Sequence, residues 1–337
     1  MTGKTVLTVI LNYRTPELTL EALAGAVREM DGISGGIVVV DNASGDASCD
    51  ILAAAIEQNG WGAGGRVRLV RSAINGGFGA GNNLGIRAGL PDGTAPDFCY
   101  LLNSDAVPQP GAIRRLLDFM AARPDAGIAG SAIRGMDGAP HQTAFRFPTI
   151  AGEFEGAART GIVTRALRDA VIPLPLPDTN CAVDWVAGAS VMLRQRMLDE
   201  IGLFDETFFL YYEETDLCRR AARAGWRTWY VTDSVVLHVG SASTGMKRWA
   251  RTPRYWFDSR LHYFTSNHGR LYALGATLAR AGGAVVWRIR VALTAKPLRD
   301  PPHFLRDLIT HLARNIARPR PRRAADPLPT PVMEDSR

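Results

Sequence analysis

The sequence has little cysteine, and this scarcity narrows the classes of protein it can encode. Only four of its 337 residues are cysteines, and no two stand at the short spacing of a zinc knuckle or a redox couple: Cys49, Cys99, Cys181 and Cys218. We therefore expect reduced thiols and a cytoplasmic protein. The first residues run directly into a strand-like segment, without the apolar block and cleavage site of a signal peptide, so we expect no export.

A long uninterrupted hydrophobic run is also missing. The most apolar stretch, residues 271–293, is broken by three arginines and by Gly282-Gly283. We expect it either to lie in a membrane interface or to pack as an amphipathic helix, and not to span a bilayer. The stretch is followed by a basic segment: residues 301–323 contain six arginines and a single acid, Asp307. This excess indicates an anionic partner or a solvated helix and tail, and we predict no nucleic-acid partner.

Residues 6–133 alternate between strand-like and helix-like patterns, which is typical of an α/β domain. We predict strands over 6–12, 37–41, 67–71, 98–102 and 127–133, and helices over 16–30, 47–58, 79–88 and 111–122. The result is a mostly parallel sheet with helices on both faces. Residues 134–182 have a weak pattern with alternating prolines and predict a loop-rich insertion, and a second structured block follows from 183 to 239.

Polar residues gather where the predicted strands end, in four segments: 12–14, 41–44, 75–83 and 103–105. In an open parallel sheet, ligands bind beyond the carboxyl ends of the strands, so we expect these loops to meet at one cleft. Each segment also has a plainer interpretation. Asp41 fits a strand-to-helix turn, the glycine-rich segment fits tight packing against the sheet, and Asp105 fits a helix cap.

A second polar cluster, Glu213, Glu214 and Asp216, follows two tyrosines and opens a helix. Acids in a first helical turn are stabilised by the helix dipole, so a capping cluster is the plainer interpretation. Three acids in four residues repel one another unless they are solvated, cap the helix or are needed for chemistry, and the aromatic surroundings favour a functional site. His238 follows an apolar strand and fits either a structural or a metal-binding histidine.

Taken in order, six segments resemble the large inverting glycosyltransferase family 2 with the GT-A fold, in particular its rhamnosyltransferase-like branch. The resemblance covers residues 5–245, and these segments carry it: Val9-Ile10-Leu11-Asn12-Tyr13-Arg14, Val39-Val40-Asp41-Asn42-Ala43-Ser44, residues 75–83, Leu101-Leu102-Asn103-Ser104-Asp105, Trp185-Val186-Ala187-Gly188-Ala189 and Glu213-Glu214-Thr215-Asp216-Leu217-Cys218. It implies a Rossmann-like central sheet flanked by helices, with a C-terminal helical extension.

The resemblance also implies a role for each site residue. The nucleotide would be held by Asn12, Tyr13, Arg14, Asp41, Asn75, Gly79, Asn83 and Asn103. Trp185, Gly188 and Asp216 would line the donor and acceptor pocket. Asp105 and His238 would bind Mg²⁺ or Mn²⁺, although Asn103 stands where the family carries the first aspartate of its metal motif. Glu214 takes the position of the catalytic base, and Glu213 is the other candidate.

By this resemblance, the chain transfers a sugar from a nucleoside diphosphate to a hydroxyl of a glycan or lipid-linked acceptor in cell-envelope polysaccharide synthesis. The implied donor is dTDP-rhamnose, with UDP-galactofuranose or UDP-GlcNAc as alternatives. A catalytically inactive relative that binds nucleotide or glycan is a second alternative. Residues 1–133 would bind the donor, 134–245 the acceptor, and 246–317 the inner face of the cell membrane, while 318–337 would be a disordered tail.

Overall fold

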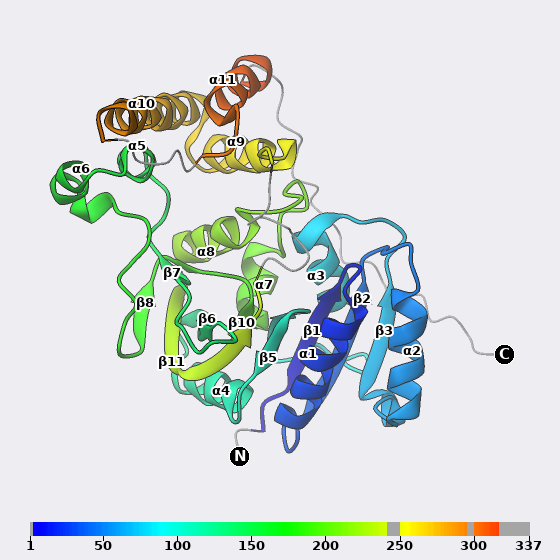
Figure 1. The fold of residues 1–337 in the computed structure, drawn as a ribbon. Helices are drawn as coiled ribbons and strands as arrows, with labels where there is room; N and C mark the ends of the chain where they lie inside the picture. Colours follow the sequence, from blue (N-terminus) through cyan, green and yellow to red (C-terminus); the bar gives the residue numbers. More distant parts are fainter. Residues whose placement is uncertain (1–2, 241–249, 295–299, 317–337) are drawn as a thin grey trace.

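A nine-stranded sheet forms the centre of the computed structural model, which describes residues 3–240, 250–294 and 300–316 (Figure 1). Its first half is parallel in the order β3-β2-β1-β4: β1 (Val6–Asn12), β2 (Gly35–Asp41), β3 (Val67–Arg71) and β4 (Phe98–Asn103). The apolar side chains of β1, β2 and β4 are buried because helices cover both faces. One face packs on α1 (Pro16–Glu29), α2 (Ser48–Gln58) and α4 (Ala112–Ala122). The other face packs on α3 (Gly77–Arg87), α7 (Gln195–Ile201) and α8 (Glu213–Arg223).

The second half of the sheet is mixed. β10 (Ser190–Arg194) runs antiparallel to both β4 and β6 (Ala126–Arg134), and β11 (Arg227–His238) pairs in parallel with β6. The short strands β5 (Ala106–Pro108) and β8 (Cys181–Val183) lie antiparallel to β11. Two helices, α7 (Gln195–Ile201) and α8 (Glu213–Arg223), follow β10 along the chain. A separate two-stranded sheet joins β7 (Ala144–Phe145) to β9 (Trp185–Val186).

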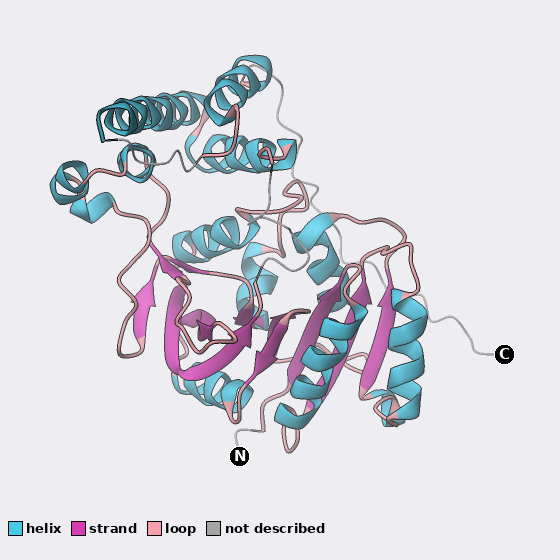
Figure 2. Cartoon of the chain, in the orientation of Figure 1, coloured by secondary structure: helices cyan, strands magenta, loops and turns pink. Residues whose placement is uncertain are grey.

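A layer of helices lies beyond one end of the sheet (Figure 2). It consists of α5 (Ile150–Ala158), α6 (Gly161–Ala166), α9 (Arg254–His268), α10 (Arg270–Thr294) and α11 (Phe304–Asn315). Besides apolar clusters, this layer buries a group of charges: Glu153 on α5 accepts hydrogen bonds from Arg260 on α9 and Arg280 on α10. Burial opposes ionisation, but the two guanidinium charges lower the pKa of the Glu153 carboxyl. The ion pairs therefore fix three helices together.

The predicted α/β class is confirmed, and every strand and helix predicted within residues 6–133 is present to within two residues at each end. Parallel pairing, however, is confined to β3-β2-β1-β4 and to β6 with β11. The loop-rich interpretation of residues 134–182 is wrong in part, because α5 and α6 lie there. The nine residues of α5 give little periodic signal, and its main partner is α10, more than a hundred residues later.

The C-terminal predictions have different outcomes. Residues 271–293 form one continuous helix, α10, despite the glycine pair. Within the described ranges, no helix is long and apolar enough to cross a bilayer. The predicted disordered tail, residues 318–337, lies outside the described residues, and the division of the chain at residue 133 stays a prediction.

Candidate active site

The carboxyl ends of β1, β2 and β4 bring three of the predicted loops to one edge of the sheet. In the parallel register Asn12 lies opposite Asp41, and Leu11 lies opposite Asn103. The Asn12 amide nitrogen donates to Asp41 at 2.7 Å and to Ser44 at 3.2 Å, and Ser44 Oγ also donates to Asp41 at 2.7 Å. Asp41 thus ties the first two loops together.

Asn12 itself is fully buried, and both ends of its amide are used within the protein. Its Oδ1 accepts from the Thr15 amide and the Thr19 hydroxyl, which places the start of α1. In this conformation Asn12 shapes the loop and presents no polar atom outward. The next residues differ: Arg14 has a positive φ of 56°, donates from Nε to the Ser44 carbonyl, and lies over the Tyr13 ring. Left-handed backbone in a non-glycine residue is costly and clusters at functional sites.

The glycine-rich segment joins the same edge through Asn75. Its Oδ1 accepts from the Asn42 side chain and from the Gly77 amide, each at 3.0 Å. The first residue of α3 is Gly77, with a φ of 86°, and a Cβ there would lie 1.8 Å from the carbonyl oxygen of Phe209. Only glycine fits this approach, which joins the segment to the chain that precedes α8.

Further along α3, two predicted nucleotide ligands point elsewhere. A Cβ on Gly79 would contact Phe204, and Asn83 is fully buried with its amide bonded to the backbone of Phe204 and to Glu206. These two residues pack α3 against residues 204–206, because a helix presents every third or fourth residue to the same neighbour. The interpretation of the glycines as packing against the sheet fits Gly81, which contacts β1, and Gly85, which contacts β1 and β2.

The loop between β4 and β5 meets the end of β11. Because β5 is antiparallel to β11 with Ala106 opposite His238, the preceding Asp105 lies beside that histidine, 133 positions away in the sequence. Asp105 Oδ1 and His238 Nε2 are 2.9 Å apart, and the amide nitrogen of Asn103 is 3.5 Å from the same ring nitrogen. Asp105 is buried, so this pair of polar side chains lies largely away from solvent at the edge of the sheet.

This pair offers two kinds of ligand to a divalent cation. The Asp105 carboxylate suits Mg²⁺ or Mn²⁺, whereas the His238 imidazole suits a transition metal, so the pair fits Mn²⁺ better than Mg²⁺. Across the described part of the chain, no group of three or more His, Cys, Asp or Glu side chains has metal-ligand geometry.

Two consecutive acids, Glu213 and Glu214, begin α8 immediately after a strained turn. Tyr211 and Tyr212 both have positive φ, 71° and 70°, which turns the chain sharply into the helix. Glu213 is 3% exposed, and the Oε2 atom of each acid is buried without a hydrogen-bond partner among the described residues. Burial and then the neighbouring Glu214 charge raise the pKa of Glu213 well above its ordinary value, and burial also raises the pKa of Glu214. Such uncompensated carboxylates are costly and typical of acid–base sites.

The acid pair and the Asp105–His238 pair are connected through the 185–189 segment. The Gly188 backbone lies near the Glu214 carboxylate and opposes the rise in its pKa, and the carbonyl of the next residue, Ala189, accepts a hydrogen bond from the backbone N–H of Asn103 at 3.0 Å. A Cβ on Gly188 would contact Phe78 on α3. Gly188 therefore lies between the two candidate catalytic groups. The Trp185 ring stacks on that of Phe145, with their centroids 4.1 Å apart, and its indole N–H donates a hydrogen bond to the Arg146 carbonyl.

Asp216, predicted to line the acceptor pocket, is fully buried and faces another way. It accepts from Arg220 at 2.8 Å and from Asn267 of α9 at 2.8 Å. Asp216 therefore joins α8 to α9 in this structure, and its assignment to the donor and acceptor pocket stays a prediction. No pattern in the sequence pointed to Asn267, or to His262, which bonds to Asp205 at 2.9 Å. His141, whose ring lies 6.3 Å from that of His238, was also missed.

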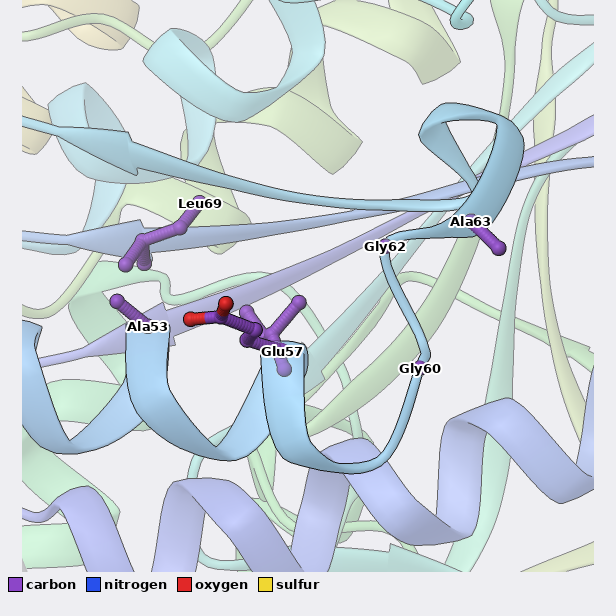
Figure 3. Close-up of a pocket in the computed structure, with 7 residues that line it drawn as sticks. Ala53, Glu57, Gly60, Gly62, Ala63 and Leu69 are labelled. Carbon is purple, nitrogen blue, oxygen red and sulfur yellow. The ribbon is translucent and has the colours of Figure 1, made fainter.

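A surface hollow lies away from these residues, between α2, β3 and the turn that joins them (Figure 3). Its lining is mostly apolar and small, with one acid: Ala53, Ile56, Glu57, Gly60, Gly62, Ala63 and Leu69. It contains no pair of groups suited to acid–base or metal chemistry, so the strand-end residues remain the candidate site.

The fold with its strand-end site defines the class: this is a GT-A fold. Two solved structures that resemble it are GalNAc-T7 with UDP, GalNAc and Mn²⁺ (TM-score 0.54, 12% identity, 91% of this chain and 54% of that one), and the mannosyltransferase PcManGT of Pyrobaculum calidifontis with GDP-Man and Mn²⁺ (TM-score 0.52, 15% identity, 93% and 87%). At these identities the likeness concerns the fold alone.

Sequence comparison then gives the family. The model of "Glycosyltransferase like family 2" matches residues 4–259, and the chain belongs to this family. An N-acetylglucosaminyl-diphospho-decaprenol L-rhamnosyltransferase of Mycobacterium tuberculosis is 33% identical over 53% of this chain, which spans 61% of that relative's length. The rhamnosyltransferase WbbL of Escherichia coli is 25% identical over 48% of this chain and 60% of its own. These relatives confirm the predicted rhamnosyltransferase-like branch.

Proposed function

We propose that the protein is an inverting glycosyltransferase that moves a sugar from a nucleoside diphosphate to an acceptor hydroxyl. The observation that carries this proposal is the acid pair, buried Glu213 and half-buried Glu214, which residues 188–189 connect to the end of β4. Asp105 follows that strand end and lies beside His238 at the end of β11. A base and a diphosphate-binding group that share one site are what a single displacement at an anomeric carbon needs.

In this mechanism Glu214 accepts the proton of the acceptor hydroxyl. The hydroxyl oxygen forms the new bond to the anomeric carbon as the bond to the diphosphate oxygen breaks on the opposite face, so the configuration inverts. The raised pKa of Glu214 makes it a stronger base than an exposed glutamate. Burial and the Glu214 charge raise the pKa of Glu213 well above its ordinary value, so Glu213 holds the proton of the pair and Glu214 is the ionised carboxylate.

Asp105 and His238 would hold a divalent cation, with Asn103 beside them. When bound, Mg²⁺ or Mn²⁺ supplies positive charge against the leaving diphosphate, a contribution of several kcal/mol in metal-assisted reactions. Tyr13, Arg14, Asp41 and Asn75 would line the nucleoside pocket, since all four belong to the loops at the carboxyl ends of the strands. Asn12 would act by positioning Asp41, because its own amide is already bonded within the protein.

For the substrates, we propose dTDP-rhamnose as donor and a lipid-linked or glycan acceptor of the cell envelope, at the inner face of the membrane. Support comes from the relatives in Mycobacterium tuberculosis and Escherichia coli, whose names specify rhamnosyl transfer, and in the first case a decaprenyl diphosphate acceptor. UDP-galactofuranose and UDP-GlcNAc are the alternative donors.

The test is nucleoside diphosphate release from each of these sugar nucleotides, with and without Mn²⁺ and with and without acceptor. Release that requires acceptor and Mn²⁺ is expected with one donor. A chain that gains thermal stability with nucleotide but releases nothing from any donor would instead be a catalytically inactive relative.

A further inference from the structure

Helix α10 packs on α5 mainly through small residues. The side that packs on α5 carries Ala276, Gly283 and Ala284, and a Cβ on Gly283 would lie 2.4 Å from the Phe154 carbonyl. Close contact with α5 therefore depends on small residues, which explains why the glycine pair does not interrupt the helix. Trp287 is buried as well, whereas most other large apolar side chains of α10 are exposed.

The large apolar residues of α10 form a continuous outward stripe. Their exposed fractions range from 37% to 86%, and they recur mostly at helical spacings along all 25 residues: Leu271, Leu274, Leu278, Val285, Ile289 and Leu293. We call this set the α10 stripe. An apolar stripe of this length on a protein surface marks an interaction site, since leaving it in water is unfavourable.

The charges of α10 indicate what covers the stripe. The helix contains four arginines and no acid. Arg280 is paired with Glu153 in the helical layer, and Arg290 donates to the Arg159 carbonyl, whereas Arg270 and Arg288 are exposed. A basic and apolar helix surface is complementary to anionic lipid, whose headgroups attract arginine while the acyl boundary accepts leucine.

The same charges disfavour a second copy of this chain as the occupant. A two-fold contact through the α10 stripe would bring the arginines of two helices together, and α10 offers no carboxylate to pair with them. Since no described helix can span a bilayer, contact parallel to the membrane surface is the remaining geometry for lipid. In Figure 1, α10 lies on the outer side of the helical layer, which stands beyond the carboxyl ends of β1 and β2.

We propose that the α10 stripe docks the protein on an anionic membrane surface, with its leucines, valine and isoleucine in the interface and Arg270 and Arg288 among the headgroups. The proposal deepens the proposed function by giving a lipid-linked acceptor a route to the site, and to that extent rests on it. Docking itself requires only α10.

The test is co-sedimentation of the full chain with phosphatidylcholine vesicles, with and without phosphatidylglycerol. We expect binding to the anionic vesicles and an affinity loss of at least about tenfold in the double variant Leu278→Ser/Ile289→Ser. The matched control, Ile51→Ser/Met136→Ser, also removes two exposed apolar side chains but lies outside α10, and should bind like the wild type. Arg270→Gln/Arg288→Gln should lose the preference for phosphatidylglycerol.

Thermal unfolding and transfer to a water-soluble acceptor should be the same for wild type and stripe variant. Wild-type protein that stays in the supernatant, or a stripe variant that sediments as well as wild type, overturns the proposal. A wild-type dimer that the stripe variant converts to a monomer would also overturn it, because the stripe would then be a self-association surface. If the protein docks but transfers sugar from no donor, the proposed function is wrong and the docking proposal stands. If it transfers sugar in solution but does not dock, the docking proposal is wrong and the proposed function stands.

Discussion

At the scale of single residues, the two acids that begin α8 lie in an environment that lowers the stability of the fold. Glu213 and Glu214 are adjacent, their Oε2 atoms are buried, and the backbone before them is in the left-handed region twice in succession. Each feature costs free energy, about 1–3 kcal/mol for a buried polar group without a partner. Several unfavourable free-energy contributions within four neighbouring residues are expected at a catalytic site.

The raised pKa of Glu214 predicts the pH dependence of turnover. A base works only when ionised, and burial moves its ionisation to a pH above the ordinary glutamate value of 4.5. Turnover at saturating donor and acceptor should therefore fall as the pH is lowered, with its midpoint above pH 4.5. The measurement is kcat as a function of pH, at a fixed Mn²⁺ concentration. A rate that stays constant down to pH 4.5 would contradict the assignment of Glu214.

Which residues could be predicted at this scale depends on how local their signal is. The placement of Asp41, Asp105 and the acid pair could be predicted because each follows a recognisable strand or begins a helix. Asn267 and His262 could not be predicted, since their contacts with Asp216 and Asp205 span 51 and 57 positions and α9 has no distinctive pattern. The buried contacts of Asn83 and Asp216 could not be predicted either, because the sequence does not reveal which face of a helix meets a neighbour.

At the scale of elements, the start of α3 is fixed by its contact with the chain before α8. Gly77→Ala would put a methyl group against the Phe209 carbonyl in addition to straining the left-handed backbone. We expect a loss of unfolding free energy about 1–3 kcal/mol larger than that of Gly64→Ala, measured by urea unfolding. Gly64 is the matched control, with a φ of 61° and no atom within 4 Å of an added Cβ. Equal losses in the two variants would show that the contact is unimportant.

The junction of α8 and α9 gives a second prediction at this scale. Asn267→Ala removes one hydrogen bond to the buried Asp216 carboxylate and another to Arg223. We expect a loss of about 1–3 kcal/mol in unfolding free energy and a lower kcat, because the same helix carries Glu213 and Glu214. Asn59→Ala, which removes an exposed hydrogen bond at the end of α2, should cost less than about 1 kcal/mol and leave kcat unchanged. If Asn267→Ala lowered stability without affecting kcat, α9 would have no part in positioning the acids.

At the scale of the whole molecule, the first half of the fold was predictable and the second was not. Residues 6–133 alternate between buried β-branched strands and amphipathic helices, so local periodicity identifies each element. β10 pairs with strands from the first half, β11 has a bulge between Val231 and Val235, and α5 packs against a helix that follows more than a hundred residues later. These contacts join residues that are far apart in the sequence, so a pattern within a short segment cannot predict them.

The same scale explains how the site is assembled. Strand register brings Asn12, Asp41 and Asn103 to one edge, the β5–β11 pairing adds His238, and the 185–189 segment links that edge to α8. Three regions of the chain must therefore fold together before the groups proposed for transfer can act on one substrate.

The most direct test of that account is the turnover of Glu214→Gln in sugar transfer with Mn²⁺. The substitution preserves size and removes only the ability to accept a proton, so kcat should fall by about 10²–10⁴-fold while the donor KM changes little. Glu213→Gln serves as the matched control and should retain far more activity. Wild-type turnover by Glu214→Gln, with activity lost instead in Glu213→Gln, would contradict the assignment of the base.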